Sequence, residues 1–313
     1  MFAYIIRRVA ATIPVMFVVA LFVFSLLYLS PGDPALIIAG DTATAEDIAR
    51  IRAALGLDQP FYVQFGTWLW HVVRGDLGIS IFTNLPVTTL IAQRLEPTVA
   101  LTLTTLVVAV SVAIPMGVVA AWKAGTWIDR LVMLFAVLGF SVPIFVVAYL
   151  LIFGFSIGLN WFPVQGYTSI RQGFLPFLRH ITLPSIALGL TYAALIARIT
   201  RASMLEVLSQ DYIRTAQAKG LSNRQVLIGH ALKNAAVPIA TIIGIGVALL
   251  ISGVVVTETV FAIPGLGRLT VDAILRRDYP IIQGVILLFS AAYVLVNLAV
   301  DVSYMLLDPR VRY

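Results

Sequence analysis

Residues 9–29 read VAATIPVMFVVALFVFSLLYL, an apolar run without a charged side chain. A transmembrane helix needs about 20 such residues to cross the ~30 Å hydrocarbon core of a bilayer. The run follows Arg7 and Arg8, as in a secretory signal peptide, but it exceeds the ~7–15 residues of a signal core, and no small-x-small cleavage site follows it. It predicts an uncleaved first membrane span.

The rest of the chain has the same character. Mean hydropathy is +0.98, with 60% hydrophobic and 12% charged residues, which a soluble domain could not solvate at its surface. The fourth apolar stretch is the weakest, because Thr182, Pro184, Thr191 and Tyr192 interrupt it. The sequence predicts an all-α integral membrane protein with six transmembrane helices. After the first span, the apolar stretches lie near residues 98–121, 131–157, 181–197, 238–257 and 281–307.

Basic residues orient these spans, because loops rich in Lys and Arg stay in the cytoplasm. The net charge of +6 is explained in this way, and no nucleic-acid partner is expected. With the N-terminus inside, the outer loops between spans three and four and between spans five and six hold five basic residues: Arg171, Arg179, Arg268, Arg276 and Arg277. The inner segments hold twelve: Arg7, Arg8, Lys123, Arg130, Arg198, Arg201, Arg214, Lys219, Arg224, Lys233, Arg310 and Arg312. Both termini are therefore predicted to be cytoplasmic.

The first outer loop, residues 31–97, contains its own helix signals. Thr44 and Asp47 have the spacing of a capping box, and Gly56 supplies a stop. A second helix is expected at 61–74, after Pro60 and before Gly75. The loop is predicted to be an ordered cap over the outer ends of the spans, a docking surface for an external partner, or both.

The inner loop, residues 198–237, predicts two helices. The first, 203–219, carries Met204, Leu205, Leu208 and Tyr212 on one stripe and stops at Gly220. The second starts with a capping box of Ser222 and Gln225 and a staple of Leu221 and Val226, and Pro238 closes the segment.

This helix-turn-helix has three interpretations. It could be an interfacial helix that lies in the lipid headgroups. It could also be a DNA-binding element, but the transmembrane spans on both sides would restrict its access to a DNA groove. Docking of a cytoplasmic protein is favoured, because two helices with separate stop and start signals exceed what simple anchoring requires.

The same loop resembles a known family. Residues 211–222, DYIRTAQAKGLS, continue to HALKNA at 230–235 and Pro238, and are similar to the cytoplasmic loop of binding-protein-dependent ABC import permeases, within them the dipeptide, oligopeptide and nickel branch. In that family the loop carries the coupling helix that seats in the ATPase subunit. The generic pattern begins Glu-Ala-Ala, whereas Arg214 and Thr215 stand at the first two positions here. By resemblance, the ATPase-coupling residues are Asp211, Tyr212, Arg214, Thr215, Ala216, Lys219, Gly220, Leu221 and Ser222.

Two outer segments extend the resemblance over nearly the whole chain. Residues 55–60 (LGLDQP), 75–80 (GDLGIS) and 86–87 (PV) are similar to the branch's first outer loop. Residues 258–267 (ETVFAIPGLG) and 277–280 (RDYP) are similar to its last. Contacts with a binding protein or an outer gate are therefore expected at Asp76, Glu258, Pro264, Gly265, Arg277 and Asp278.

The resemblance implies a type I ABC importer transmembrane domain at 98–313 and an N-terminal helix plus outer loop at 1–97. It also implies a bacterial inner-membrane location, a second, non-identical permease chain, two cytoplasmic ATPase subunits that bind ATP and Mg²⁺, and an extracytoplasmic binding protein. Peptides are the expected solutes, with nickel chelates, glutathione or other peptide-like solutes as alternatives. No cofactor or metal is expected in this chain.

The residues themselves agree with a transporter subunit that is not an enzyme. The chain has no Gly-x-x-x-x-Gly-Lys-Ser/Thr loop for ATP. Ionisable groups at the midplane, which ion-coupled carriers need, are nearly absent, and Glu258 and Asp301 near span ends are explained by snorkelling or capping. An embedded enzyme would depend on His71, His180 and His230, or on Asp278 with Glu258, without a recognised motif. A passive channel leaves the inner helix pair unexplained.

Small residues in the fifth span permit close helix packing inside the chain, against a partner chain, or in a sliding gate. Packing inside the chain is favoured. The residues are Gly244, Gly246, Ser252 and Gly253.

Overall fold

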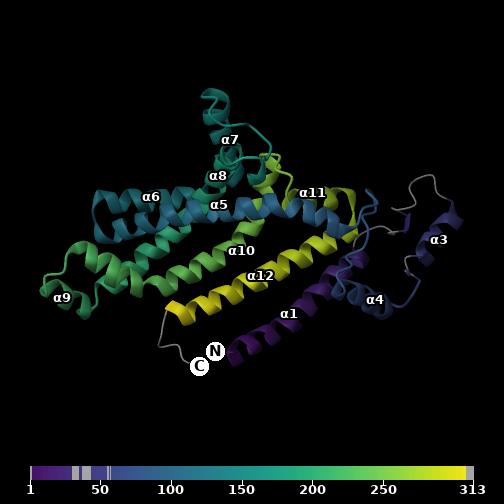
Figure 1. Ribbon diagram of the computed structural model, residues 1–313, viewed down its shortest axis with the longest axis horizontal. Coiled ribbons are helices and arrows are strands. Elements are labelled where there is room, and N and C mark those ends of the chain that lie inside the picture. Colours follow the sequence, from purple (N-terminus) through teal and green to yellow (C-terminus); the bar gives the residue numbers. More distant parts are fainter. Residues whose placement is uncertain (1, 30–34, 37–43, 55, 57, 308–313) are drawn as a thin grey trace. The chain divides into compact units, whose positions relative to one another are not determined.

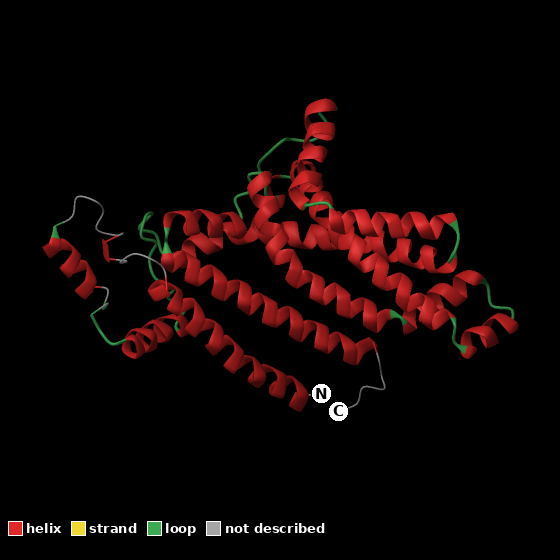
Figure 2. Ribbon diagram, turned by 180° about the vertical axis from the view of Figure 1, so that it is seen from behind, coloured by secondary structure: helices red, strands yellow, loops and turns green. Residues whose placement is uncertain are grey.

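The structure, a computed structural model, describes residues 2–29, 35–36, 44–54, 56 and 58–307, and these are mainly helical (Figure 1, Figure 2). Across these ranges the extended pairing is limited to one antiparallel bridge between Ile79 and Pro86. The predicted all-α class is confirmed. The elements are α1 (Phe2–Leu29), α3 (Ala45–Ala54), α4 (Phe61–Val73), α5 (Val87–Trp122), α6 (Trp127–Ser141), α7 (Ile144–Leu151), the π-helical η1 (Ile152–Gly158), the short η2 (Ile170–Gln172), α8 (Phe174–Leu208), α9 (Asp211–Ala218), the π-helical η3 (Gln225–Leu232), α10 (Ala236–Val260), α11 (Leu266–Arg276) and α12 (Tyr279–Leu307).

Four single helices in the described chain are long and apolar enough to cross a membrane. They are Ile6–Tyr28, Val87–Trp122, Phe174–Leu208 and Tyr279–Ser303. Two bent helix pairs, Trp127–Ser141 with Ile144–Gly158 and Gln225–Leu232 with Ala236–Val247, bring the number to six if each pair is one span. The six predicted spans therefore all fall on apolar helical segments.

The third span is not the single helix that its composition predicts. α6 ends at Ser141, and the path that continues through α7 and η1 is bent by 104° (Figure 1). Pro143 explains the break, because proline has no backbone N–H and its ring disfavours the helical conformation of the preceding residue. Val142 accordingly has the extended values φ −84° and ψ 125°.

The described residues pack as two compact units. Unit 1 comprises 95–268 with 295 onward, and unit 2 comprises 2–94 with 269–294. In unit 1, α8 packs against α6, α7 and α10. It is longer than the predicted 181–197, and the polar residues inside that stretch are accommodated by hydrogen bonds within the fold. Thr182 donates to the Leu178 carbonyl (2.6 Å) and Tyr192 to the Ile243 carbonyl.

Glycines let neighbouring helices approach α8. A Cβ at Gly117 of α5 would lie 2.6 Å from the Cβ of Thr200, and a side chain at Gly246 of α10 would overlap the ring of Tyr192. Gly253 faces Leu188 in the same way, and Gly244 faces Val300 of α12. The predicted packing role inside the chain is confirmed for the three glycines, while the side chain of Ser252 lies outside the described residues.

In unit 2, the first span packs against a helix of the outer loop. Phe24 of α1 lies 5.5 Å from Phe65 and 5.2 Å from Trp68 of α4, measured between ring centroids. Both predicted loop helices are present, and Gly56 and Gly75 adopt positive φ values of 67° and 84° at their stops. Thr44 accepts the Ile48 N–H through its carbonyl (3.1 Å). The side chain of Asp47, and Leu55, Arg310 and Arg312, lie outside the described residues.

Candidate functional site

The segment expected to meet the ATPase is a short helix with defined ends. α9 begins at Asp211, and Gly220 ends it with φ +80°. Gly220 N–H donates to the Gln217 carbonyl (2.9 Å) and Leu221 N–H to the Ala216 carbonyl (3.3 Å). This pair of bonds is the Schellman arrangement, which requires a left-handed residue where Gly220 stands. The predicted stop is confirmed.

The predicted helix 203–219 is wrong in its middle, where α8 ends at Leu208 and α9 starts afresh after Ser209 and Gln210. Because α9 is a separate helix, its residues do not continue the helical periodicity of α8, and a different set of them faces the core. As a result Ile213 is buried and Tyr212, expected on the apolar stripe with Met204, is 44% exposed.

The buried side of α9 is fixed to three other elements. Ile213 and Ala216 join one apolar cluster with Met204 of α8 and Val226 of η3. Ala121 of α5 belongs to the same cluster. α9 is therefore held to the ends of two long helices, and a force on α9 reaches both of them.

The predicted coupling residues divide between the two sides of this segment. Ala216 is buried and Leu221 is half-buried, so both support the helix from within. Arg214 and Asp211 form an ion pair (3.4 Å) in which both side chains are largely exposed, a type that contributes little. The remaining predicted residues are exposed: Asp211, Tyr212, Arg214, Thr215, Lys219, Gly220 and Ser222.

The second inner helix starts as predicted. Ser222 N–H donates to Oε1 of Gln225 (2.9 Å), and Gln225 N–H donates to Oγ of Ser222 (3.4 Å). The closing role expected of Pro238 is wrong, because η3 leads through a 68° bend into α10, and Pro238 lies in the first turn of α10. Proline is tolerated there, since N–H groups of a first turn have no partner within the helix.

Sequence reasoning missed an ion pair near this segment. Arg201 of α8 donates two hydrogen bonds to Asp129 of α6, through Nε to Oδ1 and through Nη2 to Oδ2 (2.7 Å). Asp129 is 4% exposed and also accepts the Gly125 N–H (3.0 Å). A bidentate pair fixes geometry as well as charge. The two residues are 72 positions apart in the chain, and no sequence pattern predicts a pairing over that separation.

Glu258 is a buried structural acceptor, so the expected snorkelling is wrong, whereas the alternative expectation of capping is confirmed, because the carboxylate accepts an N–H of the first turn of α11. Its side chain is fully buried, Thr98 Oγ1 donates to Oε1 (2.5 Å), and the Arg268 N–H donates to Oε2 (3.0 Å). Thr98 Oγ1 in turn accepts the Leu266 N–H (2.8 Å). A Cβ on Gly265 would overlap the carboxylate, whereas Pro264 is exposed. The carboxylate thus holds the loop after α10 against α5.

Asp278 has a comparable role in unit 2. It is 2% exposed, accepts the Ser80 hydroxyl proton at Oδ2 (2.6 Å) and the Ile81 N–H at Oδ1 (3.3 Å). Arg277 beside it has φ +57°. Asp76 is exposed, accepts the Gly78 N–H (2.9 Å) and pairs with His71 (3.3 Å).

The predicted outer residues fall into separate units. Glu258, Pro264 and Gly265 belong to unit 1, and Asp76, Arg277 and Asp278 belong to unit 2. Within the described residues, no three His, Asp or Glu side chains come together as a metal site.

Comparisons with known proteins cover nearly the whole chain. Residues 113–313 match the family model "Binding-protein-dependent transport system inner membrane component", and residues 1–102 match the model for the N-terminal part of such membrane components. A protein of Sinorhizobium fredii named "Probable peptide ABC transporter permease protein y4tP" is 56% identical over 99% of both chains. The glutathione transport system permease protein GsiC of Escherichia coli is 46% identical over the full length of both.

A solved structure supports the fold. A chain of the MetNI methionine ABC transporter, in an inward-facing conformation, superposes with a TM-score of 0.59 at 18% identity and covers 70% of this chain and 96% of that chain. The expected importer transmembrane fold is confirmed. With a family model on 113–313 and relatives matched along their whole length, this chain belongs to the family of inner membrane components of binding-protein-dependent transport systems.

Proposed function

We propose that this chain is a permease subunit of an ATP-driven importer for di- or oligopeptides. The observation that carries the proposal is the 56% identity, over 99% of both chains, with a protein named as a peptide ABC transporter permease. Glutathione, itself a peptide, is the second candidate solute, because a glutathione permease is 46% identical over its full length. The solute is delivered by an extracytoplasmic binding protein.

Coupling takes place at residues 211–222, which face the cytoplasm together with both termini. The exposed side of α9 contacts an ATPase subunit, and the buried side passes the displacement to α5, α8 and η3 through the cluster around Ile213 and Ala216. Two ATPase subunits bind ATP and Mg²⁺, and a second, related permease chain completes the channel. Asp211, Tyr212, Arg214, Thr215, Lys219 and Ser222 provide the contact, without the Glu of the generic pattern.

The outer side receives the binding protein through exposed residues of the loops, among them Asp76 and Pro264. Glu258 and Asp278 shape those loops from within and do not contact the partner, because both side chains are buried.

Uptake by the assembled importer tests the function. The chain is co-expressed with its partner permease, ATPase and binding protein, and the complex is reconstituted in proteoliposomes. ATP-dependent accumulation of labelled dialanine or trialanine, competed by other short peptides, is expected. Accumulation of glutathione alone would assign the second solute, and uptake that persists without ATP would contradict the proposal.

Orientation is tested separately. The chain has no cysteine, so Asn223→Cys introduces a single thiol beside the coupling segment. A membrane-impermeant maleimide should label this thiol in inside-out vesicles and not in intact spheroplasts. The reverse result would place residues 211–222 outside the cell and remove the proposed coupling.

A further inference from the structure

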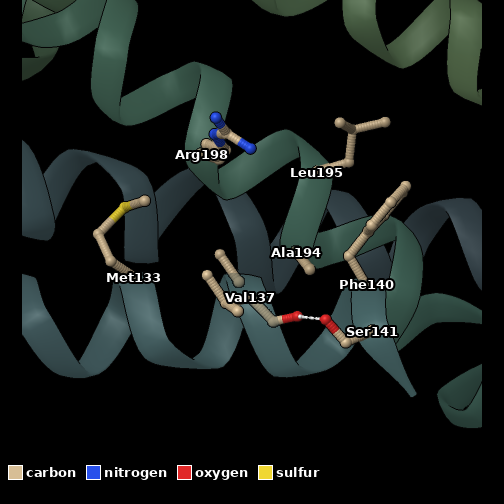
Figure 3. Close-up of a pocket in the computed structure, with 8 residues that line it drawn as sticks. Met133, Val137, Phe140, Ser141, Ala194, Leu195 and Arg198 are labelled. Carbon is tan, nitrogen blue, oxygen red and sulfur yellow. Dashed lines mark hydrogen bonds between the residues drawn. The ribbon is translucent and has the colours of Figure 1, made fainter.

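Two adjoining pockets follow one face of α8 at the break between α6 and α7. The larger, of about 360 Å³, lies between α6 and α8 (Figure 3). The smaller, of about 60 Å³, lies toward α10. Phe140 and Leu195 line both pockets, so they form one groove. On α8 the lining residues Leu188, Thr191, Leu195 and Arg198 recur every three or four positions, the spacing of one helix face.

The groove is mainly apolar, with a few hydroxyls along it and a cation at one end. Arg198 and Arg201 lie one turn apart on α8, and Asp129 neutralises the charge of Arg201. Arg198 lines the groove and is exposed, and the described residues provide it with neither an ion pair nor a hydrogen bond. A cation next to apolar walls at the end of a membrane-embedded groove attracts an anionic group and leaves the apolar surface for the rest of the ligand.

One residue that lines the smaller pocket carries a buried hydroxyl without a partner. Thr191 lines it, and its Oγ1 is buried with no hydrogen-bond partner among the described residues. The other hydroxyls nearby are satisfied, since Ser141 donates to the Val137 carbonyl (2.8 Å; Figure 3) and Tyr192 to the Ile243 carbonyl. An unmatched buried hydroxyl costs about 1–3 kcal/mol, which a polar group of a ligand would recover.

We infer that this groove holds the transported solute, with its carboxylate at Arg198, its backbone within reach of Thr191 and its side chains against Phe140 and Leu195. The inference rests on the proposed function and names the contact that this chain makes with the solute. An anionic lipid would satisfy Arg198 with its headgroup and the apolar walls with an acyl chain, but the acyl chain offers no polar group to Thr191. Broken helices at a membrane-embedded site are also a common feature of transporter binding sites, and α6 breaks at Val142 beside Ser141.

The groove has the length of a short peptide. Leu188 and Arg198 are ten residues apart, which corresponds to about 15 Å along a helix at 1.5 Å per residue. An extended tripeptide spans roughly 10 Å at ~3.3–3.6 Å per residue. Thr191 and Arg198 are seven residues apart, about 10 Å along the helix. A tripeptide therefore reaches Arg198 while its other end lies near Thr191, and a dipeptide at Arg198 ends short of Thr191.

Uptake by the complete importer in proteoliposomes tests the carboxylate contact. Dialanine and dialanine amide are each supplied at a concentration above the dissociation constant of their complex with the binding protein. Arg198→Gln should lower dialanine uptake about tenfold and leave the amide within about twofold of its wild-type rate, because only dialanine has the carboxylate. Arg198→Lys should restore much of the dialanine rate. Lys123→Gln, which removes a cation outside the groove, is the control and should change neither rate.

A second measurement does not depend on the solute. Leu195→Cys places the only cysteine of this chain in the groove, three residues before Arg198. An anionic methanethiosulfonate reagent should label it several-fold faster than a cationic reagent of similar size, and the preference should vanish when Arg198→Gln is added. Leu131→Cys, exposed on α6 outside the groove, should show no Arg198-dependent preference.

These results separate the two claims. If the wild-type importer takes up neither dialanine nor trialanine with ATP, the proposed function fails, and the labelling experiment still decides whether the groove accepts anions. If uptake occurs but Arg198→Gln lowers dialanine and its amide equally, or neither, the groove is not the solute site. A loss reproduced by removing anionic lipids from wild-type liposomes, with no dependence on the solute carboxylate, would assign the groove to lipid. Absence of any labelling would show that the groove is closed to water and would overturn the inference.

Discussion

Arg201 donates two hydrogen bonds to Asp129, 72 residues earlier in the chain, and so joins α6 to α8 one turn before Met204. Met204 belongs to the cluster that buries Ile213 and Ala216 of α9. The ion pair therefore fixes the part of α8 from which the coupling segment projects. Its geometry matters more than its net energy, because the desolvation of a buried pair offsets much of its attraction.

Removing one member of this pair is expected to destabilise the protein strongly. Asp129→Asn leaves Arg201 without its countercharge in a largely buried position and should cost on the order of 3 kcal/mol. Thermal unfolding of the detergent-solubilised chain, followed by tryptophan fluorescence, measures the change. Glu206→Gln removes an exposed carboxylate from the same helix and should lie within about 0.5 kcal/mol of wild type. Equal unfolding temperatures for the two variants would show that the pair has no structural role.

Gly220 and Gly229 offer a matched test of the helix stop. A Cβ at either position meets nothing within 4 Å, so the two differ in backbone conformation alone. Gly220→Ala forces a non-glycine residue to φ +80° and should cost about 1–2 kcal/mol, whereas Gly229→Ala within η3 should be neutral or stabilising by about 0.5–1 kcal/mol.

The same two variants separate coupling from folding. In the reconstituted importer, Gly220→Ala should lower uptake per ATP hydrolysed, because the end of α9 is displaced. Gly229→Ala should keep the wild-type ratio. If Gly220→Ala couples uptake to ATP hydrolysis as well as the wild type, the Schellman end of α9 does not contribute to coupling.

Gly265 is expected to tolerate no side chain. A Cβ there would overlap the buried carboxylate of Glu258, which cannot withdraw without losing its bonds to Thr98 and Arg268. Gly265→Ala should therefore cost about 1–3 kcal/mol, as overpacking of a filled site does. Gly154→Ala, where a Cβ meets nothing within 4 Å, is the control. Unfolding temperature and yield after solubilisation measure both, and a wild-type value for Gly265→Ala would show that Glu258 is free to move.

Local helix signals could be predicted from the sequence, and tertiary pairs could not. Gly220 as a stop and Ser222 with Gln225 as a start each depend on residues within five positions along the chain, and all three are confirmed. The break at Ser209 and Gln210 was missed because no proline or glycine marks it, and the error carried Tyr212 to the wrong face.

The partners of the buried carboxylates were missed for a different reason. Thr98 meets Glu258 across 160 positions, and Ser80 meets Asp278 across 198. Composition and periodicity indicate which residues share a helix face. They do not indicate which helix faces pack against each other. The place of Glu258 near a span end predicts snorkelling or capping; the structure shows the cap on α11, but the burial of the carboxylate has no signal in the sequence.

Ser80 and Asp278 yield a test confined to unit 2. The hydroxyl of Ser80 donates to Asp278 Oδ2 (2.6 Å) and accepts the Thr83 N–H (3.1 Å), so Ser80→Ala removes both bonds and leaves a buried carboxylate oxygen without that donor. The expected local cost is about 1–3 kcal/mol. It should appear as faster hydrogen exchange and faster proteolysis of residues 77–87, while the unfolding of unit 1 is unchanged. Thr83→Ala removes an exposed hydroxyl from the same turn, with its long bond from the Leu85 N–H (3.4 Å), and should change both rates much less than Ser80→Ala does. Equal exchange rates for the two variants would mean that other contacts hold this turn and that Asp278 does not organise it.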